Sequence, residues 1–255
     1  MHSKIHSQFQ SFKPTLIGYI ENFNTSGTLF VDGARNKIKL FELGDKTINI
    51  KSFKVPNLVN RIAYQFFRKS KAKRSFEFAT RLLEHEIGTP QPIAYFEKRT
   101  FLGFGNSYYI SEQLSVDLTF RELVEITDYP DGEIILRQFV HFSFKLHEKG
   151  IEFLDHSPGN TLIKKGFNGQ YEFYLVDLNR MNFHDSALNF ETRMKNLSHL
   201  TPKKDMVLLM SNEYAKLYQE QSESEIAARM WFYTDDFQKK FMKKIELKKR
   251  FLFRK

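Results

Sequence analysis

One stretch constrains the chain's structure more than any other: two strand-forming runs, residues 160–165 and 171–178, on either side of Asn168-Gly169. Asn-Gly is the strongest short signal for a β-hairpin, because both residues tolerate positive φ in a type I′ turn. If this pair is the centre of the turn, Asn160 lies directly opposite Asp177. Opposed residues share a face, with Cβ atoms roughly 4.5–5.5 Å apart. The pattern therefore predicts that an amide oxygen and a carboxylate meet at one end of a ribbon.

These oxygen atoms are the kind of ligand that Mg²⁺ takes, together with substrate phosphates. We therefore predict Asn160 and Asp177 as metal ligands. Asp155 sits in the loop just before the ribbon, where it can orient or deprotonate a hydroxyl next to the metal, and we predict it as the catalytic residue. An ordinary hairpin with polar ends is the alternative, and it would be preferred for any one of these residues alone.

Composition narrows the class of protein. The chain has 255 residues, 41% hydrophobic and 27% charged, which suits one large domain or two closely packed lobes. It has no cysteine, so disulfides, thiolate metal sites and a cysteine nucleophile are excluded. No apolar run approaches the ~18–20 residues of a membrane span. The first residues carry no apolar signal region, and we expect a cytoplasmic protein.

The net charge of +9 is concentrated at the C-terminus. Residues 238–255 contain nine Lys or Arg and one acid, Glu246, giving +8, so the other 237 residues carry only +1. Because apolar residues alternate with the basic pairs, this tail suits the surface of an anionic membrane. A solvated helix end and a nucleic-acid contact are the alternatives. A second basic stretch, residues 60–74, is predicted equally as a solvated helical face or as a patch for an anionic substrate or membrane.

The first half of the chain alternates strands with turn signals. Strands are predicted over residues 27–32, 36–43, 46–54, 92–98 and 107–113, with a helix over 75–86. In the third strand, Ile48 and Ile50 alternate with Lys51 and Phe53, so the two pairs lie on opposite faces. The second half is predicted to be mostly helical, with helices over residues 118–127 and 132–149 and a C-cap at Gly150.

An Asp, an Asn five residues on and a second Asp also form the layout of protein kinases, which this chain resembles. Two motifs depart from it. Phe153-Leu154-Asp155 stands in place of His-Arg-Asp, and Asp177-Leu178-Asn179 in place of Asp-Phe-Gly. The segments 150–160 and 70–77 are more similar to the lipopolysaccharide kinase family of the Kdo and WaaP type, closest to a Kdo (3-deoxy-D-manno-octulosonic acid) kinase.

The resemblance implies an α+β, protein-kinase-like fold with two lobes. Residues 1–114 would form an N-lobe with a five-stranded antiparallel sheet and one main helix. Residues 115–255 would form a mostly helical C-lobe that holds the catalytic loop, the metal-binding hairpin and the basic tail.

The resemblance also assigns nucleotide-binding residues. Lys51 stands where kinases have the lysine that binds nucleotide phosphates, and Glu77 is its candidate partner. A solvent-facing Lys51 and a surface pair of Glu77 with Arg81 are the alternatives, and Glu84 or Glu86 could replace Glu77.

Two further nucleotide-contacting segments are expected from the resemblance. Gly33 would lie in the loop over the phosphates, although the Gly-x-Gly-x-x-Gly pattern is missing there. Glu112, Gln113 and Leu114 would form the hinge that contacts adenine.

The activity implied by the resemblance is ATP- and Mg²⁺-dependent phosphate transfer to a sugar hydroxyl of the lipopolysaccharide inner core, with Kdo on lipid A favoured over heptose. The protein would then act as a peripheral protein on the inner face of the cytoplasmic membrane, without a nucleic-acid partner. The alternatives are a kinase for proteins or small molecules, a nucleotide-binding pseudokinase that serves as a membrane scaffold, and a basic nucleic-acid binder.

Overall fold

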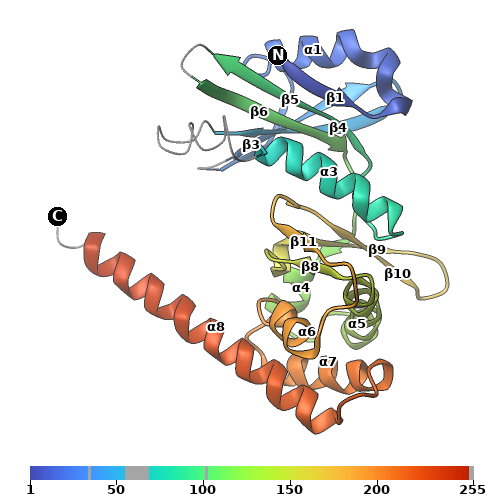
Figure 1. Cartoon of the computed structure of the whole chain (residues 1–255), viewed down its shortest axis with the longest axis vertical. Helices are drawn as coiled ribbons and strands as arrows, with labels where there is room; N and C mark the ends of the chain where they lie inside the picture. Colours follow the sequence, from blue (N-terminus) through green and yellow to red (C-terminus); the bar gives the residue numbers. More distant parts are fainter. Residues whose placement is uncertain (34–35, 55–68, 101–102, 253–255) are drawn as a thin grey trace. The chain divides into compact units, whose positions relative to one another are not determined.

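The computed structural model describes residues 1–33, 36–54, 69–100 and 103–252. The chain divides into two compact units: unit 1 is Met1–Ser115 with Asp177–Asn179, and unit 2 is Val116–Val176 with Arg180–Lys255. Unit 1 is built on an antiparallel sheet and unit 2 mostly on helices (Figure 1). The predicted α+β class is therefore confirmed. No helix among the described residues is long and apolar enough to cross a membrane.

Unit 1 holds an antiparallel sheet of six strands in the order β1-β5-β6-β4-β3-β2. Its strands are β1 (His2–Ile5), β2 (Thr28–Asp32), β3 (Asn36–Leu43), β4 (Lys46–Phe53), β5 (Pro92–Thr100) and β6 (Gly103–Glu112). We predicted five of them, and β1 was missed. This strand is only four residues long and has one buried side chain, Ile5, so it carries no periodic signal of its own. Pairing with β5 defines it.

The two faces of the sheet are covered by different helices. On one face, η1 (Ser7–Phe12) and α1 (Lys13–Glu21) contribute to a core that includes Leu16, Ile20, Ile48 and Ile50. On the other, α3 (Lys71–Glu84) packs Ala72 and Phe76 against Phe53 and Tyr95. The predicted alternation of β4 is confirmed, because Ile48 and Ile50 are fully buried on the first face while Phe53 packs on the second.

Helix α3 begins earlier than the predicted start at residue 75. Ser70 is its N-cap, and the Ser70 side chain accepts a hydrogen bond of 3.0 Å from the backbone N–H of Lys73. The basic stretch of residues 60–74 lies partly outside the described residues, which resume at residue 69. Its predicted role is therefore left as a prediction.

Unit 2 is organised around α5, whose Ile135, Leu136, Phe139 and Val140 are buried in one core. Its helices are α4 (Phe120–Glu125), α5 (Gly132–Glu148), α6 (Phe190–Leu197), α7 (Lys204–Leu217), α8 (Glu223–Leu252) and the short η2 (Pro158–Asn160). Its strands are β7 (Leu118–Thr119), β8 (Ile151–Phe153), β9 (Thr161–Lys165), β10 (Tyr171–Leu175) and β11 (Met181–Phe183). They form a β10-β9-β7 sheet and a β11-β8 pair.

The C-cap of α5 follows the prediction. Gly150 has φ +66°, the left-handed conformation that ends many helices. A Cβ there would lie 2.5 Å from the carbonyl oxygen of Ser186 and 2.6 Å from that of His184. Glycine at this position therefore lets the chain turn tightly from α5 into β8, which leads to Asp155.

Candidate active site

Lys51 is held in the middle of the unit 1 sheet. It faces Ile38 of β3 on one side and Tyr109 of β6 on the other. Its Nζ lies 2.9 Å from Oδ1 of Asp177, and the Lys51 side chain is only 13% exposed. The fold thus brings together two predicted site residues that are far apart in the sequence.

Glu77 does not take the partner we predicted. Its carboxylate lies 2.8 Å from Nζ of Lys69 and 4.0 Å from Nζ of Lys73, one helical turn earlier on α3. Within the described part of unit 1, the prediction of a Lys51–Glu77 ion pair is wrong, because Asp177 occupies Lys51 and the lysine-rich start of α3 supplies nearer cations for Glu77. The alternative that Glu84 or Glu86 is the partner of Lys51 stays a prediction.

The predicted hinge follows directly after β6. The backbone N–H of Glu112 donates to the Gln91 carbonyl (3.0 Å), and that of Gln113 donates to the Thr47 carbonyl (2.9 Å). The Glu112 carboxylate also pairs with Lys46 at 2.5 Å and raises the pKa of Lys46. Because these two backbone donors are already used, we expect Leu114 to supply any backbone N–H contact to adenine.

Gly33 lies between β2 and β3, where its N–H donates to the carbonyl of Asn36 at 3.0 Å. The two residues that complete this turn, 34 and 35, are outside the described residues. The predicted phosphate-covering role of Gly33 therefore stays a prediction.

The β9–β10 hairpin has a different register from the one we predicted. Leu175 pairs with Thr161, and Val176, not Asp177, is the residue opposite Asn160, with an N–H to carbonyl bond of 3.0 Å. The reason is that residues 167–169 form a three-residue loop, closed by the N–H of Gly166 and the carbonyl of Gln170 (2.8 Å). An odd loop length shifts the register by one. Both Asn168 and Gly169 do have positive φ, at +54° and +76°.

Asp177 is not a strand residue, since β10 ends at Leu175. It has φ +58°, a left-handed conformation that is uncommon for residues other than glycine and is concentrated at functional sites. Its Oδ1 accepts a hydrogen bond of 2.7 Å from Nδ2 of Asn179 in addition to the Lys51 contact. The turn at Asp177 therefore directs its carboxylate to β4 of unit 1.

In unit 2, one short loop holds the other two predicted residues. The Asn160 side-chain amide donates to the backbone carbonyl of Asp155 at 2.8 Å, and the N–H of Ser157 donates to the same oxygen at 2.7 Å. The carboxylate of Asp155 is 32% exposed. These bonds fix the loop between β8 and η2 and leave the Asp155 side chain accessible.

Arg180 contacts the predicted catalytic residue. Its guanidinium lies 2.8 Å from Oδ1 of Asp155, and its backbone carbonyl accepts from the N–H of Leu154. Arg180 therefore orients Asp155 within unit 2, and the other carboxylate oxygen, Oδ2, is the one available to a hydroxyl group.

A buried polar network supports the loop that holds Asp155, and sequence reasoning missed most of this network. His147 of α5 is fully buried, with ring nitrogens 2.8 Å from the hydroxyl of Tyr214 and 3.3 Å from Oδ1 of Asn196. Nδ2 of Asn196 in turn donates to the carbonyl of Phe153 at 2.9 Å. Burial lowers the pKa of His147 to about 3, so the ring is neutral. The only signal in the sequence was a histidine at the end of an otherwise apolar helix face.

His156, directly after Asp155, is fully buried between the rings of Phe139 and Phe153. Neither of its ring nitrogens has a hydrogen-bond partner among the described residues. Burial lowers its pKa to about 4. His156 therefore packs the loop that holds Asp155 onto α5 as a neutral ring.

No family model and no curated protein sequence matches the chain. Solved structures do resemble it, among them the following two. WaaP in complex with acyl carrier protein has a TM-score of 0.64 and 15% identity, covering 94% of this chain and 99% of WaaP. The Rio2 kinase–ADP/Mg²⁺–phosphoaspartate complex from Chaetomium thermophilum has a TM-score of 0.50 and 13% identity, covering 92% of this chain and 74% of Rio2. The chain has a protein-kinase-like fold. The predicted resemblance to WaaP-type kinases is thus confirmed at the level of the fold.

With a kinase-like fold established, the predicted oxygen ligands can be tested for their fit to Mg²⁺. The amide nitrogen of Asn160 is used by the Asp155 carbonyl, which leaves the amide oxygen as the ligating atom. Asp177 offers a carboxylate. Among the described residues no three His, Cys, Asp or Glu side chains gather into a metal site, and Mg²⁺ needs only one or two protein oxygens when phosphates and water complete its shell. The residues fit, and the convergence of Asn160 and Asp177 on one ion stays a prediction.

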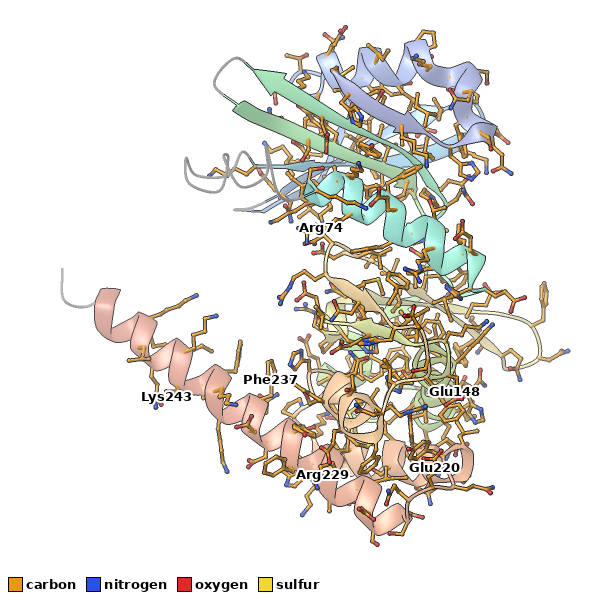
Figure 2. The ribbon with its side chains drawn as sticks, viewed as in Figure 1. Arg74, Glu148, Glu220, Arg229, Phe237 and Lys243 are labelled. Carbon is orange, nitrogen blue, oxygen red and sulfur yellow. The ribbon has the colours of Figure 1, made fainter. Side chains whose placement is uncertain are left out.

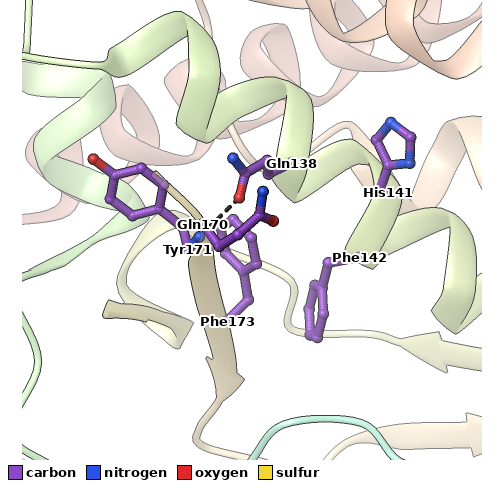
Figure 3. Close-up of a pocket in the computed structure, with 6 residues that line it drawn as sticks. All are labelled: Gln138, His141, Phe142, Gln170, Tyr171 and Phe173. Carbon is purple, nitrogen blue, oxygen red and sulfur yellow. Dashed lines mark hydrogen bonds between the residues drawn. The ribbon is translucent and has the colours of Figure 1, made fainter. Parts of the chain in front are cut away.

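Unit 2 also has an open pocket of about 450 Å³ between α5 and the hairpin (Figure 3). It is lined by Gln138, His141, Phe142, Gln170, Tyr171 and Phe173. The Gln138 side chain spans it, accepting from the N–H of Tyr171 (2.8 Å) and donating to the carbonyl of Gly169 (2.9 Å). These bonds clamp the hairpin to α5, and none of the predicted site residues lines this pocket.

Proposed function

We propose that the protein is an ATP- and Mg²⁺-dependent kinase that transfers the γ-phosphate to a sugar hydroxyl of the lipopolysaccharide inner core, with Kdo on lipid A preferred to heptose. The observation that carries the proposal is the 2.9 Å contact between Lys51 and Asp177 in a protein-kinase-like fold. If the chain had only an ordinary hairpin with solvated polar ends, nothing would bring these two side chains into contact. The acceptor class is supported by the fold shared with WaaP and by the segments 70–77 and 150–160.

The chemistry assigns one task to each side chain. Asp155 accepts the proton of the acceptor hydroxyl as the hydroxyl oxygen bonds to the γ-phosphorus and ADP leaves. Arg180 keeps Asp155 oriented through Oδ1. Lys51 exchanges Asp177 for the nucleotide phosphates, which frees the Asp177 carboxylate to act with Asn160 as a metal ligand. Mg²⁺, when bound, neutralises the charge on the phosphates.

The acceptor would be a glycolipid of the membrane. We therefore propose that the protein works in the cytoplasm, peripherally bound to the inner face of the cytoplasmic membrane. Its basic tail is the proposed contact with anionic lipid.

The proposal is tested with radiolabelled ATP and three acceptors: Kdo-bearing lipid A, a heptose-bearing lipid A core and a protein mixture. We expect label in the Kdo acceptor and a product heavier by one phosphate group. Asp155→Asn, checked for an unchanged unfolding midpoint, should lower labelling by about a hundredfold or more. Transfer to the protein mixture alone would replace the sugar acceptor with a protein acceptor.

A pseudokinase scaffold is the second candidate, and one observation favours it. Glu77 is paired with Lys69 instead of Lys51, and only one glycine is present in the loop over the phosphates. This candidate predicts that ATP with Mg²⁺ raises the thermal unfolding midpoint while no acceptor is phosphorylated. Any acceptor turnover that Asp155→Asn abolishes would exclude it.

A further inference from the structure

Helix α8 has two halves with different surroundings. In the first half, Ile226, Met230 and Thr234 are buried against the rest of unit 2 at four-residue spacing. After Thr234 no described residue of the helix is buried, and the helix extends beyond α6 and α7 (Figure 1). Its apolar side chains nevertheless continue, with Phe241 48% and Met242 54% exposed. Exposed apolar side chains on a projecting helix end are not explained by packing in the described core of unit 2.

Three apolar side chains of this half lie on one side of the helix. Phe237, Phe241 and Ile245 recur every four residues and form what we call the α8 stripe; the rings of Phe237 and Phe241 stack at 6.1 Å. Lys244 and Lys248 follow Phe241 and Ile245 by three positions and therefore lie directly beside the stripe. Figure 2 shows Phe237 and Lys243 on α8, with Lys243 on the projecting half.

The charges distinguish a lipid surface from a protein partner. The projecting half of α8 carries six lysines against one arginine, Arg250; the lysines are Lys239, Lys240, Lys243, Lys244, Lys248 and Lys249. Protein interfaces are depleted in lysine and enriched in arginine. Lysine suits an anionic lipid surface, where its long stem lies along the apolar boundary and its ammonium group reaches the headgroups.

The stripe also begins beside the catalytic loop. The ring of Phe237 packs on that of His199, with centroids 3.9 Å apart. Burial lowers the pKa of His199, while the charges of Asp155, Lys195 and Arg180 act on the same ring. His199 also lies three residues after Asn196, whose amide bonds the Phe153 carbonyl two residues before Asp155, so it connects the α8 stripe to the side of unit 2 that presents Asp155.

We infer that the projecting half of α8 binds an anionic lipid bilayer through the α8 stripe and its flanking lysines, and that this holds the Asp155 side of unit 2 at the membrane surface. The inference deepens the proposed function, on which it rests for the identity of the acceptor, by naming the surface that brings enzyme and glycolipid together. Lipid binding itself requires neither ATP nor acceptor, so the two proposals fail separately.

The test is co-sedimentation of the full chain with vesicles of phosphatidylcholine alone or with one-third phosphatidylglycerol. We expect binding to the anionic vesicles, weakening with salt, and little binding to the neutral ones. Phe241→Ser with Ile245→Ser should weaken binding by about tenfold or more, from the lost apolar burial. Replacing Lys244, Lys248 and Lys249 by Gln should weaken it by about a hundredfold, since each lysine contributes about fivefold, the equivalent of about 1 kcal/mol.

The matched control is Phe232→Ser. Phe232 is 58% exposed on the same helix, but it lies nine residues before Phe241, two and a half turns away and so on the opposite side. It should change vesicle binding less than twofold. Equal loss in Phe232→Ser and in the stripe variant would overturn the inference. So would binding of acyl carrier protein, the partner in the WaaP structure, without binding to either vesicle.

A second readout separates lipid docking from catalysis. If the acceptor glycolipid is phosphorylated, the stripe variant should lose activity on acceptor in vesicles and keep it on acceptor dispersed in detergent. Equal activity of the stripe variant and the unaltered chain on vesicle acceptor would overturn the role of α8 in presenting Asp155, while leaving the proposed phosphotransfer intact. The variant's unfolding midpoint should match that of the unaltered chain, because the projecting half contributes nothing to the core.

Discussion

The two buried histidines behind the Asp155 loop should make the fold sensitive to mild acid. Burial lowers the pKa of His147 to about 3 and that of His156 to about 4, against an ordinary value near 6.5. Their folded pKa values lie below the unfolded ones, so the unfolded chain binds protons first as the pH falls. The stability that neutral burial provides is therefore complete above pH ~6.5 and is lost progressively towards the folded pKa values.

The size of the effect follows from the distance to the unfolded pKa. A pH of 5 lies ~1.5 units below the unfolded pKa, so each histidine is protonated in the unfolded chain and still neutral in the folded one. Each histidine therefore lowers the free energy of unfolding by about 2 kcal/mol, and the two together lower it by about 4 kcal/mol. This loss is large against a typical total stability of about 5–15 kcal/mol. Carboxylates of ordinary pKa contribute little above pH 5.

His156→Phe isolates half of this effect. The ring keeps its contacts with Phe139 and Phe153, and two buried nitrogens without partners are removed. In urea unfolding at pH 8 and pH 5, the unaltered chain should lose about 2 kcal/mol more than the variant between the two values. His85→Gln, at the partly exposed C-cap of α3, should keep the full loss. An identical loss in His156→Phe and the unaltered chain would refute the reasoning.

Three further outcomes are expected. Asp155→Asn should lower kcat by about 10²–10⁴-fold with an unchanged urea midpoint, and full activity in a transfer assay would remove its catalytic role. Arg180→Gln, which frees Oδ1 of Asp155, should lower kcat by roughly tenfold, since a charge-assisted contact contributes about 1.5–3 kcal/mol, only part of which is felt at an exposed site. Arg180→Lys should recover part of it, and no kcat change in Arg180→Gln would discard its positioning role. Gly150→Ala should lower the thermal midpoint through a cost of about 1–3 kcal/mol, and an unchanged midpoint would show that the turn relaxes.

The sheet of unit 1 was predictable where residues alternate and turns carry glycine. β3 has the predicted bounds, and β4 differs from its predicted range by one residue at its end. These bounds could be predicted because the turn signals Asp32-Gly33 and Gly44-Asp45 separate the strands. The start of α3 was harder to predict from the sequence. Its first turn is rich in lysine and has little apolar periodicity, so Ser70 was the only sign of the N-cap. Likewise β1 and α1 are defined by what they pack against, which periodicity within a short segment does not reveal.

For the candidate site, sequence reasoning found residue types better than partners. Asp155, Asn160 and Asp177 stand at strand ends or in a loop, as the hairpin pattern indicated. The partner of Lys51 was wrong, since an ion pair depends on which carboxylate the tertiary fold brings nearest. The register was wrong by one because a loop of two residues and one of three share the same Asn-Gly signal. The buried bonds of Asn196 involve residues that have no mutual spacing in the sequence.

The predicted residues of unit 1 and those of unit 2 are each positioned by contacts within their own unit, and this has a kinetic consequence. Lys51 and Asp177 depend on the unit 1 sheet and on the left-handed turn at Asp177. Asp155 depends on the unit 2 loop, on Arg180 and on the Asn196 bond to the Phe153 carbonyl. In a kinase, positioning of the nucleotide governs its KM, whereas orientation of the base governs kcat. Substitutions behind Asp155 should therefore lower kcat at constant KM for ATP, and those behind Lys51 should raise that KM.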